Sequence, residues 1–77
     1  MEIKLQLFSI LREKLPKDKK GQTVLQMKEG ATIADLLEEI GINRRVAISV
    51  NGLHETDKSL QLKDGDKVKI FSSVSGG

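Results

Sequence analysis

The sequence predicts an α+β roll, in which a mixed sheet of about five strands carries one helix across one face. Several short segments alternate apolar and polar residues, as half-buried strands do. One segment, residues 32–40, instead has apolar residues at helical spacing behind an N-terminal cap. The segments run in the order strand, short helix, strand, helix and three strands, which fits a mixed sheet with a packed helix.

Composition bounds both the size of the domain and its chemistry. The 77 residues suffice for one small domain, and 38% hydrophobic with 31% charged residues is typical of a folded chain. The absence of cysteine excludes disulfides and thiolate metal sites. A net charge of +2 and two phenylalanines as the only aromatics argue against nucleic-acid binding. No apolar run approaches the ~20 residues of a membrane span. With no signal peptide visible either, we expect no membrane association and a cytoplasmic location.

The first half of the chain begins with a strand over residues 3–7, where every second residue is apolar. Ser9 is then predicted to cap a short helix over 10–15, because Pro16 cannot continue it. A second strand is expected over 22–27.

The segment after residue 30 gives the strongest helix signal. Thr32 and Asp35 form a capping box, which satisfies two backbone N–H groups of the first turn. Gly41 stands where a left-handed residue commonly ends a helix. One apolar stripe for packing on the sheet consists of Ile33, Leu36, Leu37 and Ile40.

The second half is predicted to contain three strands. The first covers 46–50 and ends in the turn pair Asn51-Gly52. Leu60 and Leu62 mark a brief edge strand. A tight turn at 64–66 leads into the last strand, which ends at Phe71.

The sequence offers little that could catalyse a reaction. His54 is the single histidine and is expected in a polar loop at the surface. The run Asp64-Gly65-Asp66 has the composition of a turn and lacks the further oxygen ligands of a calcium loop. Glycine-rich nucleotide loops and Ser/His/Asp sets are also missing. We therefore expect a protein that is no enzyme on its own and binds neither a metal nor a cofactor.

Two aromatic residues interrupt the polar faces of their strands. Phe8 is in phase with Lys4 and Gln6, and Phe71 is in phase with Lys69. If the first and last strands are parallel neighbours, the two rings lie side by side. They then either fold over the edge of the core or form an exposed apolar spot that docks a partner.

The sequence predicts a folded domain over residues 1–71, followed by a flexible tail, residues 72–77, that ends in Gly76-Gly77. Extended, six residues reach roughly 20 Å. Ordering them costs about 6–12 kcal/mol, whereas burial of Val74 returns about 1.5–3 kcal/mol. The tail therefore needs a folded docking face beside it, for which Phe8 and Phe71 are the candidates. A frayed terminus is the alternative interpretation.

Five motifs together resemble one family: FSILRE at 8–13, TIADLL at 32–37, VNG at 50–52, LKDGDKV at 62–68 and FSSVSGG at 71–77. The chain resembles the MoaD-like small subunit of molybdopterin synthase. That subunit belongs to the MoaD/ThiS sulfur-carrier family, whose fold is the ubiquitin-like β-grasp. The resemblance spans the whole chain, and the Asp-Gly-Asp turn with the last strand and Val-Ser-Gly-Gly is its most specific part.

The resemblance implies a role for the tail in sulfur transfer. A MoeB-like, E1-like activating enzyme uses ATP and magnesium to adenylate Gly77, and a sulfur donor then converts the adenylate into a thiocarboxylate. A MoaE-like large subunit receives the tail, and the sulfur passes to a pterin precursor of the molybdenum or tungsten cofactor. Gly76 gives clearance to the reactive end, while Val74 and Ser75 line the entry channel.

The resemblance does not single out one function. Many relatives carry two prolines where this chain has Ser72-Ser73, so the tail is expected to be more mobile. A thiazole-forming sulfur carrier for thiamine has the same fold and ending, but such carriers usually lack the first helix, here 9–15. The same ending also fits a ubiquitin-like modifier whose tail is conjugated to proteins. A β-grasp interaction module that carries no sulfur is the fourth possibility.

Overall fold

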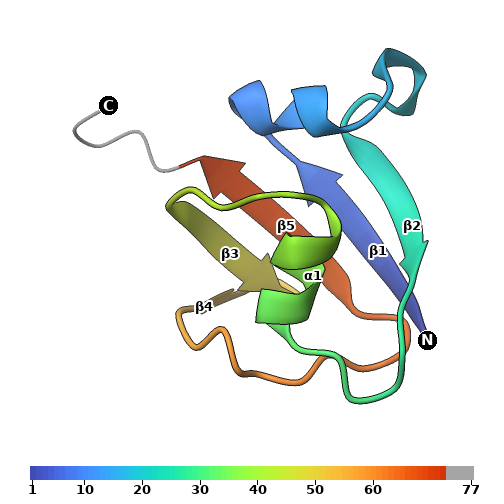
Figure 1. Ribbon diagram of the computed structural model, residues 1–77, viewed down its shortest axis with the longest axis vertical. Coiled ribbons are helices and arrows are strands. Elements are labelled where there is room, and N and C mark those ends of the chain that lie inside the picture. The colour runs from blue at the N-terminus through green and yellow to red at the C-terminus, as the bar shows by residue number, and fades with distance from the viewer. Residues whose placement is uncertain (73–77) are drawn as a thin grey trace.

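A computed structural model describes residues 1–72 and confirms the predicted roll (Figure 1). Its five-stranded sheet has the order β2-β1-β5-β3-β4, with β1 parallel to β5 and the other neighbours antiparallel. Helix α1 crosses one face of this sheet. The elements are β1 Glu2–Leu7, the 3-10 helices η1 Ser9–Lys14 and η2 Lys17–Lys19, β2 Gln22–Gln26, α1 Ile33–Glu39, β3 Val46–Val50, β4 Leu53–Glu55 and β5 Lys67–Ser72.

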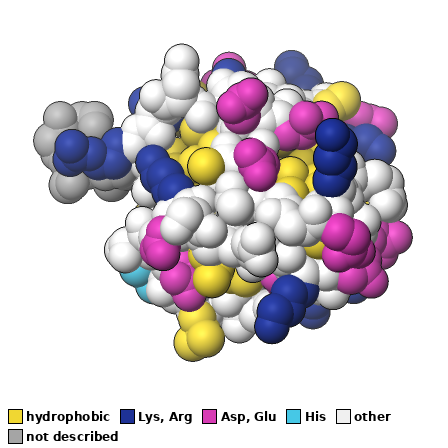
Figure 2. Space-filling view, turned by 60° about the horizontal axis from the view of Figure 1, so that its bottom comes forward, with side chains coloured by type: hydrophobic (Ala, Val, Ile, Leu, Met, Phe, Trp, Pro, Cys, Tyr) yellow, Lys and Arg dark blue, Asp and Glu magenta, His cyan; other side chains and the backbone are white. Residues whose placement is uncertain are grey.

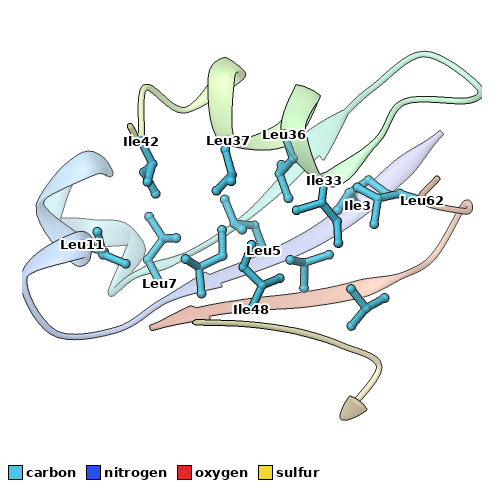
Figure 3. Packing of buried hydrophobic residues seen from close by; sticks show 13 residues of the cluster. Ile3, Leu5, Leu7, Leu11, Ile33, Leu36, Leu37, Ile42, Ile48 and Leu62 are labelled. Carbon is cyan, nitrogen blue, oxygen red and sulfur yellow. The ribbon is translucent and has the colours of Figure 1, made fainter. Parts of the chain in front are cut away.

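The core lies between the sheet and α1 (Figure 3). The inward residues of β1 are at most 2% exposed, because their period of two places all of them on the helix side. From the opposite side, the predicted helical stripe supplies Ile33, Leu36 and Leu37, all buried, while Ile40 is partly buried. Leu11 of η1 closes one end of the core.

The start of α1 is fully hydrogen-bonded. The predicted capping box is present: Asp35 N–H donates to Thr32 Oγ1 at 3.2 Å, and Thr32 N–H donates to Asp35 Oδ2 at 2.9 Å. The two remaining first-turn donors bond to the loop that precedes β5, Ile33 N–H to Leu60 O at 3.1 Å and Ala34 N–H to Lys58 O at 2.9 Å. These bonds supply the partners that a helix start otherwise lacks.

The end of α1 is a Schellman motif around Gly41. This glycine has φ +75°, and its N–H donates to Glu38 O at 3.1 Å. Ile42 N–H reaches back to Leu37 O at 2.9 Å, and both of these side chains are in the core. The predicted left-handed C-terminal residue is thus confirmed.

The prediction of the fourth strand was wrong. The return strand is β4, Leu53–Glu55, which pairs with β3 immediately after the turn. Asn51 and Gly52 have φ values of 52° and 85°, the two positive values of a type I′ turn, which forms a two-residue hairpin. His54 therefore lies in an edge strand instead of a loop, and its side chain is exposed.

Residues 60–62, where the strand was expected, lie in a loop with one isolated bridge, Thr32 to Gln61. Leu62 is buried, and its N–H donates to Ala31 O at 2.8 Å. Leu60 and Leu62 thus hold this loop against the core and the start of α1. The alternation of these two leucines reflects their contact with the core and not the pairing of a strand.

The short helix after β1 also differs from the prediction. It is a 3-10 helix, with Leu11 as its one buried residue. Ser9 has φ +56°, and the N-cap position belongs to Phe8 without a side-chain bond. The turn after the strand uses a left-handed residue, so Ser9 is not available as the cap.

Candidate partner-binding face

The sheet has two faces that differ in chemistry. Alternation sends the even-numbered residues of β1 and the odd-numbered residues of β5 away from α1. No other element covers this side within residues 1–72 (Figure 1). We call it the open face. On β1, on the residue that follows it and on β5, this face consists of Glu2, Lys4, Gln6 and Phe8 with Lys67, Lys69 and Phe71.

Phe8 and Phe71 stack on this face, with ring centroids 4.4 Å apart and planes 13° apart. The cause is the parallel pairing of β1 and β5, in which Leu7 is opposite Ile70. Phe8 N–H continues the ladder by donating to Ile70 O at 3.1 Å. The predicted juxtaposition of the rings is therefore confirmed. Phe71 remains 37% exposed and Phe8 half-buried, so the pair presents an apolar surface to solvent.

Lysines occupy the two rows of the open face next to the stacked rings. Lys69 is opposite Gln6 on β1 and Ser49 on β3, one row from the aromatic pair, and Lys67 is opposite Lys4 in the next row. The lysine rows border a shallow hollow of about 280 Å³ that extends to Val24 of β2. The face thus combines an apolar centre with positive charge, which favours an acidic partner surface.

Ala47 and Val24 complete the apolar part of the open face, and the sequence reasoning missed both. Ala47 of β3 is opposite Phe71, and Val24 of β2 is opposite Lys4 and 50% exposed. The two residues belong to strands far apart in the sequence. In the sequence, the alternation of each strand indicates that Ala47 and Val24 point away from the core. Only the strand order places both residues on the same face as Phe8 and Phe71.

The last described residue, Ser72, belongs to β5 and is opposite Val46. The strand therefore continues one residue beyond the predicted domain boundary. Residues 73–77 lie outside the described part of the chain, and with them the candidate site residues Val74, Ser75, Gly76 and Gly77.

The two aspartates of the 64–66 turn have structural partners. Asp64 accepts a bond from Glu2 N–H at 2.6 Å, and Asp66 accepts bonds from Lys63 N–H and from Asn51 Nδ2. Among residues 1–72, no group of three or more His, Cys, Asp or Glu side chains could hold a metal ion. In the same part of the chain, no helix has the length and apolar character to cross a membrane.

A five-stranded mixed sheet that carries one helix across one face is the arrangement of the ubiquitin-like β-grasp fold. The match to a family model is specific: residues 5–77 match the ThiS family. The chain belongs to this family of ThiS/MoaD-type sulfur carriers. Its members are small carrier proteins that are generally non-catalytic.

Solved structures share the fold of this chain. A putative molybdopterin converting factor, subunit 1, from Pyrococcus furiosus is 27% identical, with a TM-score of 0.78 over 96% of this chain and 99% of that one. SAMP1 from Haloferax volcanii shares the fold at 19% identity and TM-score 0.75 over all of both chains. A complex of subunits 1 and 2 of the molybdopterin-converting factor from Helicobacter pylori gives 21% identity and TM-score 0.60, also over all of both chains. Comparison with curated proteins found no match.

Proposed function

We propose that this protein is the small subunit of a cytoplasmic molybdopterin synthase and carries sulfur as a thiocarboxylate on Gly77. The observation that carries the proposal is the ThiS-family match, which continues through residue 77. The likeness to a putative molybdopterin converting factor subunit 1 favours the pterin pathway within the family. The short helix η1 supports the same choice, because it stands where thiazole-forming carriers usually have none.

The chemistry needs an activating partner. A terminal carboxylate has a pKa of about 3.3–3.7, so it is ionised at neutral pH and a poor electrophile. A MoeB-like enzyme would use ATP and magnesium to form an acyl adenylate on Gly77, with pyrophosphate as the leaving group. Sulfur from a donor then attacks the carbonyl carbon and AMP leaves. One oxygen of the carboxylate is thereby exchanged for sulfur. ATP and magnesium belong to that enzyme, and this chain supplies the acceptor carboxylate.

The open face would dock the partners that the tail serves. Phe8 and Phe71 provide an apolar centre immediately before residues 73–77, and Lys67 and Lys69 provide a charged border. A MoaE-like large subunit with an acidic border around an apolar pocket would fit this surface. The Helicobacter structure, a complex of subunits 1 and 2 of the molybdopterin-converting factor, supports a large subunit as the partner. With the face engaged, Val74, Ser75 and Gly76 would enter the partner's channel and deliver the Gly77 sulfur to the pterin precursor.

The second candidate is a sulfur carrier for thiazole formation, which the name of the matching family favours. Both carriers share the activation step, so the accepting molecule distinguishes them. We expect the thiocarboxylated protein, with a MoaE-like subunit, to convert the pterin precursor. Conversion of the thiazole precursor alone would assign the chain to the other pathway. Transfer of the tail to lysines of other proteins would identify a modifier.

The test of the carrier role is the mass of the intact protein. After incubation with a MoeB-like enzyme, ATP, magnesium and a sulfur donor, the protein should be about 16 Da heavier, the difference between sulfur and oxygen. Deletion of Gly77 should abolish the gain, while Leu53→Ala, a change in the distant edge strand β4, should leave it intact. A known carrier, activated in parallel, shows that the enzyme is competent. If the mass of this protein then stayed unchanged, the carrier role would be excluded and a non-carrier interaction module would be the remaining interpretation.

A further inference from the structure

The two edges of the sheet differ in what they offer to another strand. Strand β2 is an edge, and its ladder with β1 begins with a mutual pair in which Met27 N–H donates to Met1 O at 2.8 Å and Met1 N donates to Met27 O at 2.7 Å. Hydrogen-bonded and non-bonded pairs alternate in an antiparallel ladder. The backbone groups of Gln22, Val24 and Gln26 therefore point away from β1, toward solvent.

Strand β2 also lacks the usual protection of an edge. Its sequence, Gln22 to Gln26, is QTVLQ, which contains no charged residue and no proline. Exposed edges are usually short, charged or interrupted, since they otherwise recruit further strands. The other edge follows that rule: β4 has three residues, and its Glu55 carries a charge.

We propose that β2 pairs with β2 of a second copy of this chain, antiparallel and about a twofold axis beside Val24. The pattern of the strand is self-complementary for this arrangement. Val24 would oppose Val24 of the second copy, and Gln22 would oppose Gln26 of the second copy, in hydrogen-bonded pairs that use the outward backbone groups. The half-exposed Val24 side chains would meet on the open face and cover each other.

Charge distribution along β2 supports the antiparallel direction. The segment before the strand is basic, with Lys17, Lys19 and Lys20 in and after η2. The region after it is acidic on balance, because a hollow of about 640 Å³ at the end of β2 is lined by the four acidic residues Glu29, Asp35, Glu38 and Glu39 against one basic residue, Lys28. Figure 2 shows several groups of acidic side chains, and one of them lies toward the right of the view, near Lys or Arg side chains, on the side where Figure 1 places β2. An antiparallel pair brings the basic end of each copy to the acidic end of the other, whereas a parallel pair would align like charges.

This association does not depend on the proposed sulfur chemistry. Strand β1 separates β2 from β5, so the aromatic pair at the end of β5 stays uncovered in the paired arrangement. The result would be a two-copy carrier in which Val24 of each open face is covered, while the aromatic pair and the lysines of β5 remain available to partners.

Sedimentation equilibrium of the full chain tests the proposal. From about 10 μM to about 1 mM, the average mass should rise from 8.5 kDa toward twice that value, in the range of a weak association. Raising the salt concentration should weaken the association, because the charge contacts are exposed. In parallel, NMR amide signals of Gln22, Val24 and Gln26 should shift with concentration.

Two matched variants locate the interface. Val24→Lys places like charges opposite each other at the twofold and should weaken association by about tenfold or more, while Val24→Thr keeps a β-branched residue and should retain it. Leu53→Lys, the corresponding change on the β4 edge, should have no effect. A monomer at the highest concentration would overturn the proposal, as would association that persists in Val24→Lys or is lost in Leu53→Lys. Circular dichroism verifies that each variant is folded.

Discussion

Both faces of the sheet contact large apolar side chains, but only those on the covered face are shielded from water. On the covered face, Leu36 and its neighbours are excluded from water, and every first-turn N–H of α1 has a partner. On the open face, Phe71 stacks on Phe8 and keeps more than a third of its surface in solvent. The covered face thus accounts for the stability of the fold, whereas the open face holds apolar surface that the fold does not need.

This difference has a physical origin in the alternation of each strand. Consecutive residues of β5 serve opposite purposes, because Ile70 is fully buried while Phe71 faces solvent. A change at one position can therefore alter stability and leave binding intact, or the reverse. Substitutions on the two faces test this separation.

The largest expected loss of stability comes from the covered face. Leu36→Ala removes a side chain with no exposed surface and should lower the free energy of unfolding by about 2–5 kcal/mol. Urea denaturation followed by circular dichroism measures the loss. A loss below that of Phe71→Ala would contradict the assignment of stability to the covered face.

A comparable loss is expected where the chain enters β2. Gly21 has φ +78°, and a Cβ there would lie 2.7 Å from Leu7 O, the residue whose N–H donates to Gly21 O. Gly21→Ala should cost about 1–3 kcal/mol for the backbone conformation and more for the clash. Gly52→Ala is the matched control, since it has φ +85° but no atom within 4 Å of the added Cβ. Denaturation midpoints should fall further for Gly21→Ala, and equal losses would show that φ alone matters.

A smaller effect on stability, but a large one on binding, is expected from Phe71→Ala. Loss of the stacked pair should cost about 0.5–1.5 kcal/mol beyond the lost area. Affinity for a MoaE-like subunit, measured by calorimetry, should fall by about tenfold or more, as for an aromatic residue at the centre of an interface. Leu53→Ala, an exposed apolar residue on β4, should leave the affinity unchanged. If Phe71→Ala left binding intact, the aromatic pair would have a structural role alone.

Local sequence signals predicted most of the covered face. The capping box, the helical stripe and Gly41 depend on residues within one or two turns, and all were confirmed. The stacking of Phe8 on Phe71 was also predictable, because a single parallel pairing of the end strands suffices to join the rings.

Long-range contacts account for what the sequence did not reveal. Leu60 and Leu62 alternate as in a strand, yet their loop is held by backbone bonds to residues before and within α1. The strand that pairs with β3 in the hairpin, Leu53–Glu55, could not be predicted from its sequence. It is an exposed edge strand and therefore shows little alternation of apolar and polar residues. Ala47 reaches the open-face site through strand order, which a single segment does not encode.

The smallest effect is expected in the loop that bonds to the start of α1. Asp57 accepts bonds from Ser59 Oγ at 2.5 Å and from Ser59 N–H at 2.9 Å, and these bonds hold the pKa of its carboxyl below the usual value of 3.8. A lowered folded-state pKa means that the ionised carboxylate stabilises the fold above pH 3.8, and that this contribution is lost as pH falls through the lowered pKa.

Asp57→Asn mimics the protonated state, so it should be slightly less stable than the wild type at neutral pH. The two proteins should converge in acid, as denaturant midpoints measured across pH would show. A difference between wild type and Asp57→Asn that persisted at the lowest pH would mean that the charge is not what stabilises this loop.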